Sequence, residues 1–128
     1  MNSTASKATS LQSTIENLVQ KYQIQINIKQ IVQADDVVVI NGCLILKQEE
    51  YSQTFRDRKD ITSVIAPYLK KVPFDMFFNA SNLKNVIMPA AEEIEKGSTK
   101  IGAFMGTQVE NCCFPKLATI GAYVFKGC

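Results

Sequence analysis

Histidine is absent from this chain of 128 residues, and that absence removes several classes of function together. Imidazole is the usual general base, the activator of serine and cysteine nucleophiles, and the commonest metal ligand in proteins. The nearest substitute is the Ser81 to Lys84 spacing, which matches a Ser-x-x-Lys motif but opens no recognisable active-site helix, so we interpret it as chance. We therefore expect a protein that is not an enzyme and that needs no cofactor.

An excess of charge of one sign is also missing. The chain has 14 Lys and Arg against 12 Asp and Glu, which gives a formal net charge of +2. Such a balance predicts no strong attraction to nucleic acid or to anionic lipid. Hydrophobic residues make up 46% and charged residues 20%, as in ordinary globular domains. The length fits one core, so we expect a polar tail over residues 1–9 and a single domain over residues 10–128.

Long apolar runs are missing too. The longest stretches lie at Val37 to Ile40 and Cys43 to Leu46, far short of the roughly 18 residues that a membrane span requires. The segment Met1 to Lys21 is rich in Ser, Thr, Gln and Asn and lacks the apolar core of a signal peptide. We expect a soluble protein of the cytoplasm or of a virion, with no membrane contact and no export through a signal peptide.

The cysteines do not predict a metal site. They are Cys43, Cys112, Cys113 and Cys128. No Cys-x-x-Cys pair is present, and the two adjacent cysteines would point to opposite faces of a strand. Two neighbouring acids, Asp35 and Asp36, fit a turn better than a cation site. We therefore expect no bound metal, small buried side chains at Cys43 and at one of the adjacent pair, and a free thiol at Cys128.

Apolar spacing predicts three helical regions. The first has Ser10 as its cap and apolar residues at Leu11, Ile15, Leu18, Val19 and Tyr22. A second, short helix would follow Asp60 and carry Ile61, Val64, Ile65 and Leu69. A third would use the stripe from Leu83 to Ile94, with its firmer part from Ala90 to Lys96 after Pro89.

Strands are predicted on both sides of the helical middle. Ile24, Ile26 and Ile28 alternate with polar residues, and residues 101–105, 108–114 and 117–125 are typical of a β-meander. The clearest local signal is Asn41-Gly42 between two apolar strands, Val37 to Ile40 and Cys43 to Leu46, which predicts a type I′ hairpin.

Together these elements predict an α+β domain. One largely antiparallel sheet, or two small ones, would carry two or three helices on one side, in the order α-βββ-α-α-βββ. A helix followed by a meander occurs twice in this order, but residue identity is too low to indicate an internal repeat.

Apolar residues that are consecutive rather than alternate indicate that both faces of the hairpin strands are covered. A helix can cover one face, and a second layer or another subunit must cover the other, which favours self-association. A cluster of aromatic residues near position 76 belongs either in the core, which we favour, or in an exposed patch. The candidate interface residues are Val37, Val39, Leu44, Leu46, Phe74, Met76, Phe77 and Phe78.

Five cations form a second candidate site. They are Arg56, Arg58, Lys59, Lys70 and Lys71, and they include both arginines of the chain. Converging guanidinium groups could hold phosphate, with Tyr51 and Phe55 stacking on bases. The alternative, which we favour, is a solvated loop neutralised by its own Asp57 and Asp60.

The sequence thus favours a non-enzymatic structural subunit that associates with itself and with other subunits of an assembly, of which a virus or phage particle is one example. Two alternatives stay open. One is a small module that binds anions or nucleic acid through the five cations. The other is a regulator that docks a protein through the Phe74 to Phe78 loop.

Overall fold

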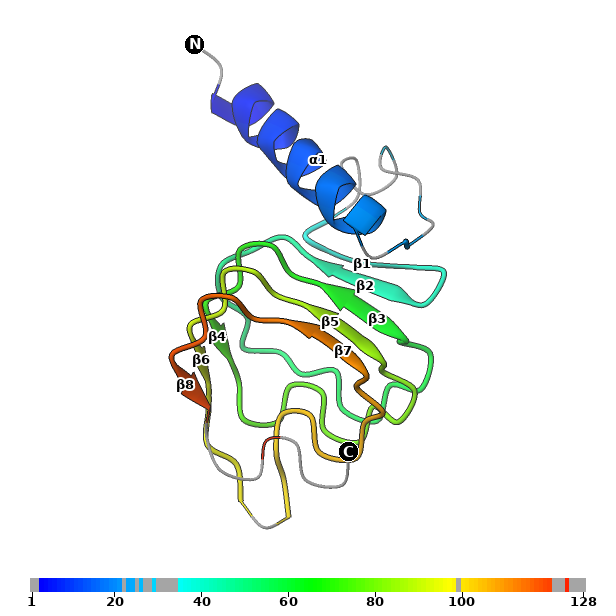
Figure 1. The fold of residues 1–128 in the computed structure, drawn as a ribbon, viewed down its shortest axis with the longest axis vertical. Helices are drawn as coiled ribbons and strands as arrows, with labels where there is room; N and C mark the ends of the chain where they lie inside the picture. Colours follow the sequence, from blue (N-terminus) through cyan, green and yellow to red (C-terminus); the bar gives the residue numbers. More distant parts are fainter. Residues whose placement is uncertain are drawn as a thin grey trace.

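The computed structural model describes residues 3–21, 23–24, 26, 29, 35–98, 100–120 and 124, and it shows a β-solenoid (Figure 1). The elements are α1 (Ser3–Lys21), β1 (Val37–Ile40), β2 (Cys43–Leu46), β3 (Ser63–Ile65), β4 (Lys71–Val72), β5 (Asn85–Ile87), β6 (Glu93–Ile94), β7 (Asn111–Cys113) and β8 (Thr119–Ile120).

Parallel pairing between successive turns of the chain builds the solenoid. One sheet has the order β1-β2-β3-β5-β7, and a second sheet has the order β4-β6-β8. β2, β3, β5 and β7 pair in parallel with no slip in register, so Cys43, Ser63, Asn85 and Asn111 stand in one row. β4, β6 and β8 are likewise parallel. The chain therefore repeats one path, with β2, β3, β5 and β7 starting four successive coils.

A repeated spacing of apolar residues fills the interior. Each of three sets has its members 3, 2, 3 and 3 positions apart, and the strand registers place the sets on top of one another. The β3 set is Ile61, Val64, Ala66, Leu69 and Val72. The β5 set is Leu83, Val86, Met88, Ala91 and Ile94. The β7 set is Val109, Cys112, Phe114, Leu117 and Ile120. All members of the first two sets are 0% exposed.

Hydrogen bonds between coils form a third side without regular strands. The amide of Phe55 donates to the carbonyl of Met76, and the amide of Phe77 donates to that of Ala103. The rings of Phe55, Phe77 and Phe104 stack along the interior, with centroid distances of 5.8 Å and 5.6 Å. These offset aromatic contacts add to the burial of the rings themselves.

The third side ends at the same turn in each coil. Asp57, Asn79 and Gly106 have φ values of 60°, 59° and 78°, the left-handed region that these three residue types tolerate best. The side-chain amide of Asn79 donates to the Asp57 carboxylate at 2.8 Å, and this hydrogen bond links two of these turns.

The predicted hairpin is confirmed. β1 and β2 pair antiparallel, and Asn41 and Gly42 have φ values of 52° and 78°, as a type I′ turn requires. All four residues of β2 are buried. One face lies against the solenoid interior, and the other belongs to an apolar cluster with Ile15 and Val19 of α1. Both faces of β2 are covered within the chain, so its apolar residues no longer support self-association.

The predicted α+β fold with antiparallel sheets and two or three helices is wrong. The described residues contain one helix, α1, and the sheets are parallel apart from the β1–β2 pair. The segments predicted as second and third helices contain β3 to β6 instead. Their 3-2-3-3 spacing resembles a helical stripe because the chain turns a corner between strands, which brings residues three apart to the same interior.

Other expected elements also differ. α1 begins at Ser3, so it takes in most of the segment that we assigned to a polar tail. Ile24 and Ile26 are not in a strand, and Ile28 lies outside the described residues. The predicted C-terminal meander is replaced by β7 and β8, which pair in parallel with earlier coils. No helix in the described part of the chain is long and apolar enough to cross a membrane.

Candidate functional site

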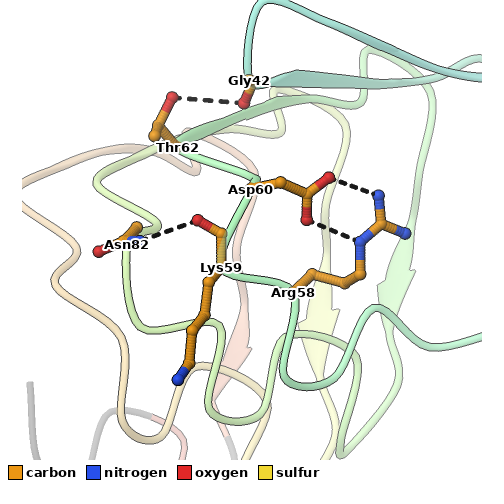
Figure 2. Close-up of polar contacts among 6 residues, drawn as sticks. All are labelled: Gly42, Arg58, Lys59, Asp60, Thr62 and Asn82. Atoms are coloured by element: carbon orange, nitrogen blue, oxygen red, sulfur yellow. Dashed lines mark hydrogen bonds and ion pairs between the residues drawn. The ribbon is translucent and has the colours of Figure 1, made fainter.

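The two arginines of the cationic candidate site are engaged by acids of the same chain. Arg58 donates from Nε and from a terminal nitrogen to the two carboxylate oxygens of Asp60, each at 2.8 Å (Figure 2). This hydrogen bonding raises the pKa of Arg58 and lowers the pKa of Asp60. Both carboxylate oxygens of Asp60 are thus used by Arg58. The charge of Arg58 is neutralised within its own loop, as expected for a solvated and internally neutralised segment.

Arg56 has a different set of neighbours. Its guanidinium lies 3.7 Å from the Asp75 carboxylate and 5.1 Å from the centre of the Phe78 ring. The carboxylate belongs to the next coil, so this contact ties two coils together at the surface. A guanidinium between a carboxylate and an aromatic face serves as a link between coils.

Lys59 and Lys71 do not join the arginines. The Lys59 side chain points away from Arg58 and Asp60, while its carbonyl accepts a hydrogen bond of 2.8 Å from Asn82 (Figure 2). Lys71 lies on β4 beside Glu93 of β6, with 3.8 Å between the charged groups. Lys70, immediately before β4, is exposed. Three of the five cations therefore form separate ion pairs instead of a common anion site.

The candidate interface residues divide sharply in burial. Leu44, Leu46, Met76 and Phe77 are each 0% exposed, which places them in the interior where a partner cannot reach them. Val37 and Phe78 are partly buried. Val39 and Phe74 keep 37% and 44% of their surface exposed.

One open depression of about 250 Å³ lies between the first three coils. Its lining residues are Glu50, Tyr51, Lys71, Pro73 and Glu95. The Tyr51 hydroxyl already donates to the Asp36 carbonyl at 2.9 Å, so it anchors the loop that precedes β1. Three of the five lining residues are charged, and two of these are acids.

The cysteines have unequal environments. Cys43 is 2% exposed, and this burial raises the pKa of its thiol to about 12. Cys112 is exposed, Cys113 is partly buried, and all three are free thiols. Cys128 lies outside the described residues. Among the residues that are described, no three His, Cys, Asp or Glu side chains gather closely enough to hold a metal ion.

The β7–β8 end of the solenoid exposes interior positions. Val86 and Ile94 of the β5 set are 0% exposed, whereas their neighbours in the next coil, Cys112 and Ile120, are exposed. Ile120 keeps 57% of its surface in contact with solvent, the largest value among the exposed large hydrophobic side chains of the described residues. We call this surface, formed by the β7 set and the edges of β7 and β8, the open end.

Our sequence reasoning missed the open end because it missed the repeat. The signal that could have found it is the position of Pro67, Pro89 and Pro115, each two residues after the end of β3, β5 or β7. Unequal coils hide it: β5 starts 22 residues after β3, and β7 starts 26 residues after β5.

No family model, curated protein or solved structure matches this chain.

Proposed function

We propose that this chain is a non-enzymatic structural subunit that associates with itself through the open end of its solenoid. The observation that carries the proposal is the contrast along one interior column: Val72 and Ile94 are 0% exposed, and Ile120 is 57% exposed. A stack of coils needs a cap at each end, because every coil buries its apolar residues only against its neighbours. A second copy supplies such a cap.

The two ends of the stack differ. At the other end, Leu44, Leu46 and Phe55 of the first coil are at most 4% exposed, and Val37 of β1 packs against the same interior cluster. The open end lacks this cover in the described residues, since Cys112 and Ile120 stay exposed. Self-association through the open end therefore uses the surface that gains most from burial.

The gain from Ile120 alone is substantial. Full burial of a large aliphatic side chain contributes about 1.5–3 kcal/mol, so covering the exposed part of Ile120 in two copies contributes on the order of 2–3 kcal/mol. The rest of the β7 set adds to this value. A virus or phage particle remains one setting for such a subunit, on the sequence grounds given above.

Anion or nucleic-acid binding is not part of this proposal. Arg56, Arg58 and Lys71 are each paired with an acid of the same chain, which reduces the positive potential that a phosphate backbone would meet.

Light scattering on a sizing column tests the proposed function. We expect the mass to rise to a multiple of 14.2 kDa with protein concentration and to change little with salt, because the contact is apolar. Ile120→Lys should shift the protein to the 14.2 kDa species. Val39→Lys is the matched control, because it places the same charge on an exposed valine at the other end.

Two outcomes would contradict the proposed function. One is a monomer at every concentration. The other is dissociation by Val39→Lys with no effect of Ile120→Lys. Circular dichroism of each variant separates loss of association from loss of folding.

A further inference from the structure

We propose that two copies of this chain meet at their open ends around a two-fold axis, with β7 of one copy antiparallel to β7 of the other and Cys112 opposite Cys112. This inference rests on the proposed function, because it specifies the geometry of the same self-association. A two-fold axis perpendicular to the sheet of β7 reverses both the stacking direction and the strand direction, so the two edge strands that it relates are antiparallel.

The backbone of β7 has its free edge at Cys112. The Asn111 amide donates to the Lys84 carbonyl at 3.1 Å, and the Cys113 carbonyl accepts from the Met88 amide at 3.0 Å. Both groups therefore face back toward the preceding coil. Because neighbouring residues of a strand direct their backbone groups to opposite sides, the N–H and C=O of Cys112 face the open side. Two copies can thus exchange two hydrogen bonds at this position.

Side-chain orientation selects the same register. Cys112 continues the interior column of Val64 and Val86, whereas Asn111 and Cys113 face outward. A shift of one residue would place an interior side chain opposite an outward one, which the alternation of a strand disfavours. A shift of two toward the C-terminus would pair Cys112 with Phe114, which lies beyond the end of β7 at Cys113.

Charge also permits self-pairing. A two-fold contact brings the same strand edge of both copies together, so like charges near the axis would repel each other. β7 consists of Asn111, Cys112 and Cys113, and β8 consists of Thr119 and Ile120, none of which is charged. Edge strands that avoid pairing usually carry lysine, proline or an inward charge, and β7 has none of these.

The same geometry predicts a closed dimer. A filament would require the open end of one copy to bind the opposite end of the next copy. Figure 1 shows α1 beyond β1 at that opposite end, and the interior residues Leu44 and Leu46 below β1 are 0% exposed. Because the apolar interior is closed at that end, we expect association to stop at two copies.

Disulfide cross-linking tests the register. A hydrogen-bonded antiparallel pair has Cα atoms about 5.5 Å apart, within the range that a disulfide spans. The reporter is the Cys113→Ser, Cys128→Ser double variant, which keeps Cys112. The matched control is Cys112→Ser, Cys128→Ser, which keeps Cys113. Cys43 stays in both variants because it is buried.

The oxidant is diamide, which accepts the two electrons and two protons released when two thiols become one disulfide. We expect the reporter to convert to a covalent dimer that reducing agent reverses, and the control to show loss of that product. Native light scattering of both variants before oxidation gives the mass independently of cross-linking.

The outcomes distinguish the register of the β7 contact from self-association itself. A dimer that cross-links through Cys112 and not through Cys113 supports the two-fold register. A dimer that fails to cross-link through Cys112, or that cross-links through Cys113, overturns the register while the self-association stands. Mass that grows beyond two copies overturns the closed dimer, and a monomer throughout overturns the proposed function itself.

Discussion

Phe77→Ala and Phe74→Ala should have very different effects on folding. The two residues lie three positions apart in one aromatic segment, yet Phe77 is 0% exposed and Phe74 is 44% exposed. Phe77 stands between two other rings, with centroids 5.8 Å from Phe55 and 5.6 Å from Phe104. Its removal therefore opens a cavity in the middle of the aromatic column and breaks both contacts.

The expected magnitude follows from that position. Truncation of a buried phenylalanine to alanine costs about 3–5 kcal/mol, and the loss of two stacked neighbours favours the upper part of that range. A domain of this size has a free energy of unfolding of roughly 5–15 kcal/mol, so Phe77→Ala removes a large share of it. Phe74→Ala should cost about 1 kcal/mol or less, because much of that ring is already in solvent.

Urea denaturation followed by circular dichroism measures both values. We expect a large decrease in the midpoint for Phe77→Ala and a small one for Phe74→Ala, with similar slopes. Equal losses, or a larger loss for Phe74→Ala, would refute the assignment of Phe77 to a stacked interior column. Such a result would agree instead with the alternative in which Phe77 docks a partner from an exposed loop.

Two further predictions concern single positions in the coils. Gly106→Ala should destabilise the fold by about 1–2 kcal/mol in urea titrations, because φ is 78° there and a Cβ would lie 3.3 Å from the Asn79 side-chain oxygen. For Cys43, burial raises the thiol pKa from 9.0 to about 12, so the unfolded chain loses this proton first as the pH rises. The stability that the protonated Cys43 thiol contributes is full below pH 9 and decreases between pH 9 and 12, with a loss of about 1.4 kcal/mol at pH 10. Over this pH range the urea midpoint should therefore fall less in Cys43→Ala than in the wild type.

Local chemistry explains why the hairpin was predictable. Asn41-Gly42 between two apolar strands admits few structures, because both residues favour the positive φ of a type I′ turn. The consecutive apolar residues of β2 also indicated correctly that both of its faces are covered. What the sequence did not show is that the interior of the same chain covers one face, and this removed the reason for treating Leu44 and Leu46 as interface residues.

The solenoid was not predictable from apolar periodicity alone. Val86, Met88 and Ala91 point to one interior although they lie in strand and corner, and their spacing is close to that of a helix. Propensity favoured the same error, since Ala90 to Lys96 is rich in good helix formers. Parallel pairing with the coils on either side decides the structure here, and these contacts are distant in sequence.

For the cationic candidate site, the sequence predicted only that its charge is neutralised within the loop. The loop acids near Arg58 indicated internal neutralisation, and the structure pairs Arg58 with Asp60. The open end depends instead on which coil is the last one in the stack. Its exposed interior residues can be recognised only when the pairing of the coils is known. In the sequence, Cys112 is one of two adjacent cysteines. In the structure it stacks on Val86 and Val64 as the last residue of an interior column.

Amide hydrogen exchange at Cys112 is the sharpest test of self-association through the open end. The Cys112 amide faces the open side of β7, whereas the Asn111 amide donates to Lys84 within the chain. We predict that exchange at Cys112 slows as the protein concentration rises into the range of self-association, while exchange at Asn111 does not change with concentration. A Cys112 amide that exchanges at the same rate at every concentration would contradict self-association through the open end.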